Sequence, residues 1–334
     1  MTRLGTRRLR LGWLVAAAFL AAGLSLVAGL VLVLAQAATP GPAAVAIAVL
    51  AEEDGRSLIR HARGETWIPA APQRIVALDP ALVDAVLALD TTPVGIAAYG
   101  NQPYAWLVEE LAGVPIVGDP AAPDLEAVAS LTPDLILLSE DQVAFLSPQT
   151  LQVIAPIVVL TAPQADVART LLDVGLLIGK EEQAAVRLAL YDERLARARE
   201  QVAAAVGTQP VAVLSLYRGQ PRLYGVTSPP GALYRDLGLT PAPLVPLAPV
   251  DDQWWVPLST ERLPELGAEH LFLMAAEEGL LEELSNTGLW ETVPAVRDGH
   301  VYQISNEQLS AWWGNVLGRE AAIAGAVVAL TGAP

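Results

Sequence analysis

Two stretches of the chain repeat one pattern, and this repeat constrains the fold more than any other feature of the sequence. Residues 123–138 and 258–273 place apolar side chains at the same positions when Glu126 is aligned with Glu261. Each copy begins with that Glu in the first turn of a short amphipathic helix, then turns and enters an apolar run typical of a buried strand. We therefore expect two related lobes, each with one exposed Glu at the same place, and a cleft between them.

Outside the repeat, short apolar strands alternate with short helices on both sides of one long helical segment. Such alternation is typical of parallel α/β sheets that are covered on both faces. The long segment keeps helical periodicity past Gly175 and Gly179, which indicates a rigid connector. The predicted class is α/β, with two similar lobes built on central parallel sheets, one long connecting helix and a ligand cleft between the lobes. The predicted parts are a linker at 39–56, an N-terminal lobe at 57–165, a connecting helix at 166–206 and a C-terminal lobe at 207–332.

The N-terminus predicts export of the chain. An Arg-rich start precedes 25 uncharged residues, 11–35; at about 1.5 Å per residue a helix of that length crosses a ~30 Å hydrocarbon core. Residues 35–37 are a small-x-small sequence of the kind that signal peptidase cuts. Residues 1–38 are therefore a signal peptide or an N-terminal membrane anchor, and the length favours the anchor. Both alternatives make the rest extracytoplasmic, either periplasmic or on the cell surface, because the positive charge stays inside.

Composition excludes several kinds of protein. The chain has 36 acidic and 20 basic residues and a net charge of −16, so it is a poor nucleic-acid binder. Cysteine is absent, which removes disulfides and thiolate metal sites. His61, His270 and His300 lie in separate strand-like segments, so direct capture of a bare metal ion is disfavoured and no metal ligands are predicted. We find no nucleophile elbow, zinc-protease helix or phosphate-binding Gly-rich loop, so no catalytic residues are predicted and an exported enzyme is disfavoured.

The candidate ligand-binding residues follow the ends of predicted strands, where open α/β sheets bind their ligands. Most of them are aromatic. A Trp in such a loop offers a wide flat face and one N–H donor, which suits a planar chelate. Arg218 can pair with an anionic ligand. The predicted ligand-binding residues are Tyr99, Tyr104, Tyr217, Arg218, Tyr224, Trp254, Trp255 and Trp312. For Trp312 the alternative is packing of the C-terminal helix, and for Tyr99 and Tyr104 it is a solvated loop.

Several segments, in their order and spacing, resemble the substrate-binding proteins of ABC importers that deliver iron–siderophore complexes, haem and cobalamin. They are residues 72–78, 93–96, 123–126, 133–136, 177–181 and 294–302. The resemblance covers roughly residues 57–330. It implies two α/β lobes joined by one long helix, a monomer, and no cofactor. Trp255, six residues before Glu261, resembles the cleft-lining Trp of that family.

The resemblance also implies a function. The chain is expected to capture a metal chelate, with an iron–siderophore favoured, and to deliver it to an ABC importer permease. Glu126 and Glu261 fall where the family places one acidic residue per lobe for docking onto permease arginines. Two alternatives remain open: a cobalamin or haem receptor of the same fold, and a membrane-tethered sensor without transport. The scarcity of basic residues near the predicted cleft favours a neutral or weakly charged ligand.

Overall fold

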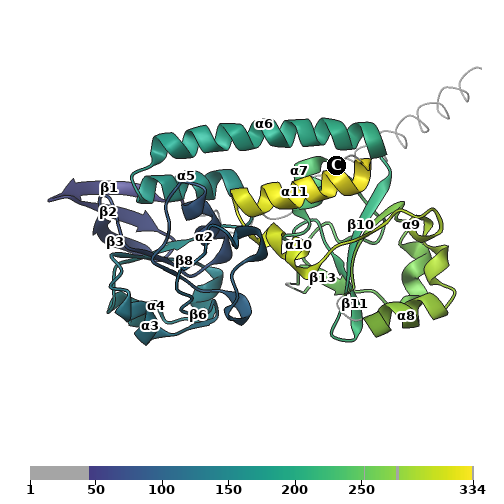
Figure 1. Cartoon of the computed structure of the whole chain (residues 1–334), viewed down its shortest axis with the longest axis horizontal. Coiled ribbons are helices and arrows are strands. Elements are labelled where there is room, and N and C mark those ends of the chain that lie inside the picture. Colours follow the sequence, from purple (N-terminus) through teal and green to yellow (C-terminus); the bar gives the residue numbers. More distant parts are fainter. Residues whose placement is uncertain (1–44, 252, 276–277, 333–334) are drawn as a thin grey trace, which may run out of the picture. The chain divides into compact units, whose positions relative to one another are not determined.

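A four-stranded parallel sheet forms the core of the N-terminal lobe (Figure 1). Its order is β5 (Gly95–Ile96), β4 (Ile75–Ala77), β8 (Leu135–Ser139) and β9 (Ile157–Leu160). All its strand residues are buried, as expected for strands covered on both faces. The covering helices are α2 (Pro80–Leu87), α3 (Leu125–Ser130), α4 (Pro148–Gln152) and α5 (Val167–Leu177), and a small ribbon joins β6 (Gly118–Asp119) to β7 (Ala122–Pro123).

The sheet of the C-terminal lobe has parallel central strands and an antiparallel edge. The order is β13 (Trp255–Pro257), β11 (Gln220–Tyr224), β10 (Pro210–Tyr217), β14 (His270–Ala275) and β15 (Val301–Gln303), and β12 (Thr240–Pro241) also pairs with β10. β10, β14 and β15 are parallel to one another. β11 follows β10 through a hairpin and pairs with it antiparallel, and β13 pairs antiparallel with β11. Helices of this lobe are α7 (Ala232–Leu237), α8 (Glu278–Asn286), α9 (Pro294–Arg297), α10 (Asn306–Ser310) and α11 (Val316–Thr331).

The repeat seen in the sequence has a direct structural counterpart. In the first copy, α3 leads into β8; the Asp124 side chain caps the helix by accepting from the backbone N–H groups of Glu126 and Ala127. In the second copy, the 3-10 helix η4 (Thr260–Glu265) leads into β14. Pro264 lies inside η4 and has no N–H to donate, which helps explain why this copy is not an α-helix. Both copies place the Glu in the first turn and a central parallel strand directly afterwards, as the sequence predicts.

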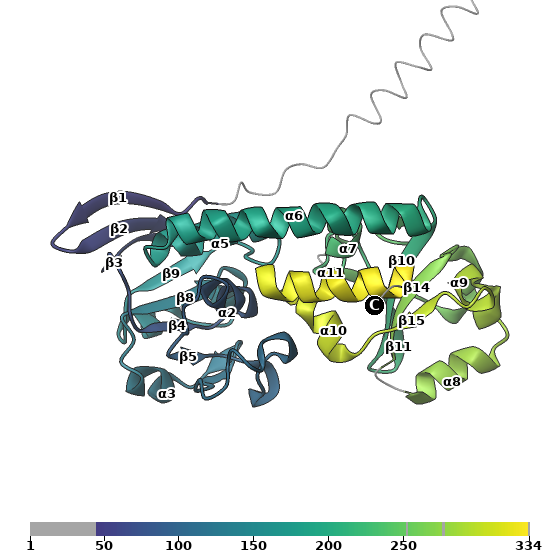
Figure 2. The ribbon, with the colours of Figure 1, turned by 45° about the horizontal axis from the view of Figure 1, so that its top comes forward.

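The segment predicted as one connecting helix forms two helices, α5 and α6 (Glu181–Val206). The chain turns between them at Gly179, whose φ of +69° is the left-handed conformation that favours glycine. At Gly175 a Cβ would lie 2.6 Å from the Ala184 Cβ, so glycine permits the close approach of α5 to α6. α6 alone is the long element: it packs against α5 of the N-terminal lobe, α7 of the C-terminal lobe and α11 (Figures 1 and 2).

A three-stranded antiparallel sheet precedes the N-terminal lobe. It is formed by β1 (Ala48–Glu53), β2 (Arg56–His61) and β3 (Gly64–Pro69). The sequence predicted a linker at 39–56, so β1 falls within the predicted linker. The sequence did not predict β1, because its residues are exposed or half-exposed and show no alternation of buried and exposed side chains.

The computed structural model describes residues 45–251, 253–275 and 278–332. The predicted signal or anchor segment lies outside these residues. Within them, no helix has the length and apolar character needed to cross a membrane. Residues from Ala44 onward form one compact unit with two clusters of buried apolar side chains, and we expect this unit to fold on its own.

Two glycines on α11 provide a test of how closely this helix is packed. A Cβ at Gly318 would lie 2.6 Å from the Ala311 carbonyl oxygen and 2.9 Å from the Trp106 indole nitrogen, whereas a Cβ at Gly325 would meet nothing within 4 Å. We expect Gly318→Ala to lower the free energy of unfolding by about 1–3 kcal/mol. Gly325→Ala should raise it by about 0.5–1 kcal/mol, because alanine is the better helix former. Chemical denaturation of both variants measures the difference; equal effects would contradict the close packing at Gly318.

Candidate functional site

Two adjoining cavities lie between the lobes, and we call them together the interlobe cleft. The larger has a volume of about 430 Å³ and the smaller about 190 Å³. Both are lined by Pro80 and Tyr99 of the N-terminal lobe and by Trp313, which follows α10. The shared residues show that the two cavities are neighbouring parts of one site.

The cleft lies at the carboxyl ends of strands from both sheets. In the N-terminal lobe, Asp79 follows β4 and Tyr99 follows β5. In the C-terminal lobe, Tyr217 ends β10 and Met274 lies near the end of β14. This is the edge at which open α/β sheets bind ligands. Here the two edges face each other across the cleft.

A stack of three side chains forms the wall of the C-terminal lobe. The Arg222 guanidinium carbon lies 4.2 Å from the ring centroid of Trp255 and 4.8 Å from that of Tyr217. Arg222 itself lines the larger cavity, and its buried Nε has no hydrogen-bond partner among the described residues. The two aromatic rings hold the guanidinium in place without using its N–H groups. The wall therefore presents a guanidinium that is held in position and whose Nε–H can still donate a hydrogen bond to a ligand.

The floor of the N-terminal lobe is fixed by buried hydrogen bonds. The Tyr104 hydroxyl donates to the carbonyl oxygen of Ala97 at 2.7 Å, and its ring stacks on Trp106 with centroids 5.0 Å apart. The Gln142 side-chain amide donates to the carbonyl oxygens of Leu78 (2.7 Å) and Pro120 (2.9 Å), which ties the end of β4 to the loop after β6. These contacts fix the positions of Tyr104 and Gln142 in the lining of the cleft.

The acidic side chains of the cleft outnumber the basic ones. Arg222 is the one basic side chain among the described lining residues, whereas Asp79, Asp141 and Glu307 are acidic. Burial raises the pKa of Asp79 to about 6, against the lowering effect of its hydrogen bonds to Ser139 and the backbone. Asp79 is thus mostly ionised at pH 7, and the cleft carries a net negative charge at that pH.

Five of the eight predicted ligand-binding residues line the cleft: Tyr99, Tyr104, Tyr217, Tyr224 and Trp254. Tyr99 is 58 % exposed and Trp254 41 % exposed, so both offer a free ring face, whereas Tyr104 and Tyr224 are buried and expose only part of the ring.

The structure does not bring the other three into the cleft. Arg218 is exposed at the tip of the hairpin between β10 and β11, where its guanidinium covers the ring of Tyr217 at 5.2 Å. Trp255 lies behind Arg222 and supports it. Trp312 is only 4 % exposed and stacks on Arg319 beneath α11, in keeping with the packing alternative.

The cleft is also lined by residues that the predicted set lacks, and Arg222 and Trp313 are two of these. The signal for Arg222 was present: it stands two residues before Tyr224 on one strand, and residues i and i+2 share a face. No comparable rule separates Trp313 from Trp312, because the short helix that contains both determines which ring faces the cleft.

Glu126 and Glu261 are both exposed, and neither forms an ion pair with a described residue. Next to Glu261, Arg262 instead pairs with Glu265 at 3.0 Å. Both carboxylates are thus available to a partner, and their docking role stays a prediction.

The described residues hold no group of three His, Asp or Glu side chains that could bind a metal ion. The histidines are less separate than the sequence suggested. His270 and His300 stack with ring centroids 4.8 Å apart, because β14 and β15 are neighbours. His270 is also bonded to Tyr302 and Gln209, which is a structural role.

The chain is similar to known proteins in both sequence and fold. The family described as periplasmic binding protein matches residues 75–307. The ferric enterobactin-binding periplasmic protein FepB of Escherichia coli is 30 % identical over 286 residues, which cover 78 % of this chain and 87 % of FepB. The Fe(3+)-citrate-binding protein YfmC of Bacillus subtilis is 26 % identical over 265 residues, covering 77 % and 80 %.

Solved structures show the same fold. The FhuD protein from S. pseudintermedius superposes with a TM-score of 0.68 at 21 % identity, covering 84 % of this chain and all of FhuD. Staphylococcus aureus SirA complexed with staphyloferrin B gives a TM-score of 0.66 at 24 % identity, covering 81 % and 96 %. Both therefore have two α/β lobes arranged as in this chain.

Proposed function

The chain belongs to the periplasmic binding protein family. We propose that it is an extracytoplasmic receptor for an iron chelate. It binds the chelate in the interlobe cleft and delivers it to the permease of an ABC importer. The observation that carries this proposal is the cleft itself, in which aromatic faces and one stacked guanidinium meet at the carboxyl ends of both sheets. The relatives named for ferric enterobactin and ferric citrate support iron as the cargo. The role is binding rather than catalysis.

The charge of the cleft favours a neutral chelate over an anionic one. An anionic chelate needs several guanidinium or ammonium groups to replace its lost hydration. Among the described lining residues the cleft offers Arg222 alone against three carboxyl groups, Asp79, Asp141 and Glu307. A neutral ferric trihydroxamate fits this balance better than ferric citrate or a ferric tris-catecholate. Arg222 then donates to the ligand oxygens of one hydroxamate.

Calorimetric titration of the unit that begins at Ala44 tests the proposal. The ligands are a ferric trihydroxamate, ferric citrate, a ferric tris-catecholate, haem and cobalamin. We expect one-to-one binding, tightest for the trihydroxamate. Tightest binding of haem or cobalamin would replace the iron–siderophore assignment by the tetrapyrrole alternative. No binding of any of the five would remove the receptor role and leave a tethered sensor as the better account.

Trp255 should matter for affinity although it does not line the cleft. Trp255→Ala removes one of the two rings that hold the Arg222 guanidinium, so the cation gains freedom that it loses again on binding. We expect chelate affinity to fall at least tenfold, measured by the same titration. Trp67→Ala is the matched control, because Trp67 of β3 makes the same kind of contact outside the cleft: the guanidinium carbon of Arg56 in β2 lies 5.8 Å from its ring centroid. Equal affinity in the parent and Trp255→Ala would assign Trp255 a purely structural role.

A further inference from the structure

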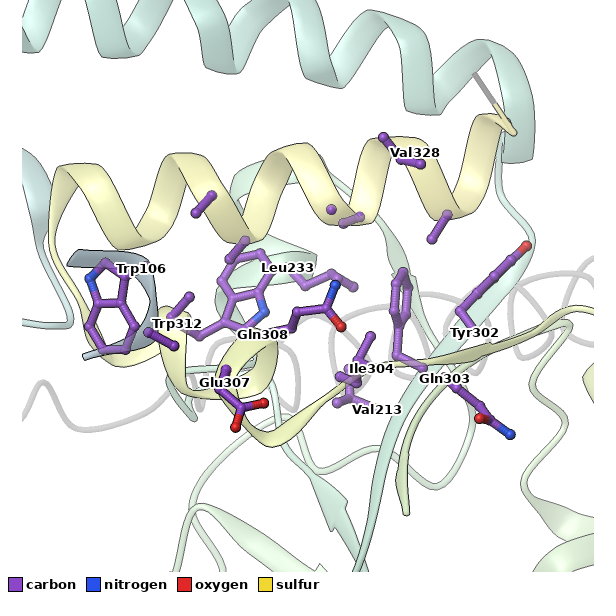
Figure 3. A pocket seen from close by; sticks show the side chains of 18 residues that line it. Trp106, Val213, Leu233, Tyr302, Gln303, Ile304, Glu307, Gln308, Trp312 and Val328 are labelled. Atoms are coloured by element: carbon purple, nitrogen blue, oxygen red, sulfur yellow. The ribbon is translucent and has the colours of Figure 1, made fainter. Parts of the chain in front are cut away.

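An apolar groove of about 400 Å³ runs beneath α11, outside the cleft described above (Figure 3). One side is the small-residue face of α11, including Ala322, Gly325 and Ala326, and the opposite side carries Leu233 and Phe272. Polar side chains, among them Tyr302, Gln303 and Gln308, also contribute to its lining. The lining of the groove is therefore mainly apolar.

The groove is continuous with the interlobe cleft. Ala105, Trp106 and Glu307 line both the groove and the larger cavity of the cleft. In Figure 3 Trp106 lies at one end of the groove and Tyr302 at the other, with Glu307 between them and nearer to Trp106. A molecule bound in the cleft can therefore extend a chain past Trp106 and along α11.

The space along α11 is open. A Cβ at Gly325 would meet nothing within 4 Å, and Ala321, Gly325 and Val328 are exposed. Apolar surface left open beside a ligand site is itself a binding surface. Because the groove is continuous with the cleft, one ligand can occupy both.

We propose that this groove receives an apolar arm of the chelate, so that the ligand is amphiphilic: an iron-chelating head in the cleft and an alkyl chain along α11. The inference rests on the proposed function. The polar head fits the polar and aromatic lining of the cleft, and the alkyl chain fits the apolar lining of the groove. Burying a methylene group strengthens binding by roughly fourfold, so a chain of several methylenes has a large effect even if only part of it is buried.

The test uses two linear ferric trihydroxamates that differ only in the acyl group on a terminal amine, acetyl in one and octanoyl in the other. Both are uncharged at that amine, so the comparison isolates the alkyl chain. We expect the octanoyl chelate to bind the unit from Ala44 onward at least tenfold more tightly. Gly325→Leu fills the groove and should remove this advantage without changing the affinity for the acetyl chelate.

Ala324→Leu is the matched control, because Ala324 is exposed on α11 and lines a different hollow, between α11 and α6. It should keep the octanoyl advantage. Equal affinities of the two chelates for the parent would overturn the inference while leaving the receptor function standing. Binding of neither chelate would overturn both. Binding of free octanoate as tightly as the octanoyl chelate would also overturn it, since the groove would then be a lipid site independent of the cleft.

Discussion

Replacing both Glu126 and Glu261 with Ala is expected to abolish delivery to the importer while leaving chelate affinity unchanged. Both side chains are exposed at matching places, one per lobe, and neither has an ion-pair partner among the described residues. An exposed carboxylate in a first helical turn can accept a bidentate pair of hydrogen bonds from a guanidinium. If each pair contributes about 1.5 kcal/mol, loss of both weakens docking more than a hundredfold.

Iron uptake by the importer reconstituted in lipid vesicles measures delivery, and calorimetry measures chelate affinity separately. The matched control replaces two other exposed carboxylates, Glu110 and Glu265, of which Glu265 lies on the same 3-10 helix as Glu261. The control should transport normally. Loss of chelate binding in the Glu126/Glu261 variant, or unaltered transport by it, would contradict the docking role.

The second large effect is expected at Asp84, a fully buried carboxylate that joins α2 of the N-terminal lobe to the start of α11. Its Oδ1 accepts from the Leu317 backbone N–H at 2.8 Å and its Oδ2 from that of Gly318 at 2.6 Å. Oδ2 also accepts from the Trp106 indole N–H at 3.1 Å. Asp84→Ala leaves these buried donors unpaired, so we expect the free energy of unfolding to fall by about 3 kcal/mol, measured by chemical denaturation. A loss below about 1 kcal/mol would contradict this joining role.

The same carboxylate predicts a dependence of stability on pH. Burial raises the pKa of Asp84 to about 6, although the hydrogen bonds from Gly318 and Leu317 lower it. Between the unfolded value of 3.8 and about 6, the folded state therefore binds more protons than the unfolded state. The contribution of Asp84 to stability is then greatest near pH 4 and falls as the pH rises through this window, by up to about 3 kcal/mol.

Asp84→Asn isolates this effect, because the amide keeps the size of the side chain and does not titrate. The free energy of unfolding of the parent minus that of Asp84→Asn should decrease as the pH is raised from 4 to 7. A difference that stays constant over this range would show that Asp84 is not the titrating group.

The two-lobe fold could be predicted from the sequence because its signals are local. Apolar runs followed by short helices identify β8 and β14, and the repeat of Glu126 and Glu261 relates them. β1 could not be found in this way, because its exposed residues carry no pattern. The turn that separates α5 from α6 was not predicted, because the helical periodicity continues on both sides of Gly179.

The cleft was predictable only in part. Strand ends in a parallel sheet converge, and this rule placed Tyr99 and Tyr217 at the cleft, which both residues line. The role of Trp255 depends on a contact across two strands with Arg222, which no local pattern shows. The groove under α11 depends on how the last helix packs against the C-terminal sheet, which is a long-range arrangement and therefore lay beyond the reach of sequence patterns.

Locating the iron itself tests most directly whether the interlobe cleft binds an iron chelate. A crystal of the unit from Ala44 onward with ferric trihydroxamate, measured at the iron absorption edge, gives the position of the metal without reference to the rest of the ligand. We expect one iron site within the interlobe cleft, between Tyr99, Arg222 and Trp313, with no protein side chain as its ligand. Iron bound directly by carboxylates, or a chelate bound outside the cleft, would contradict it.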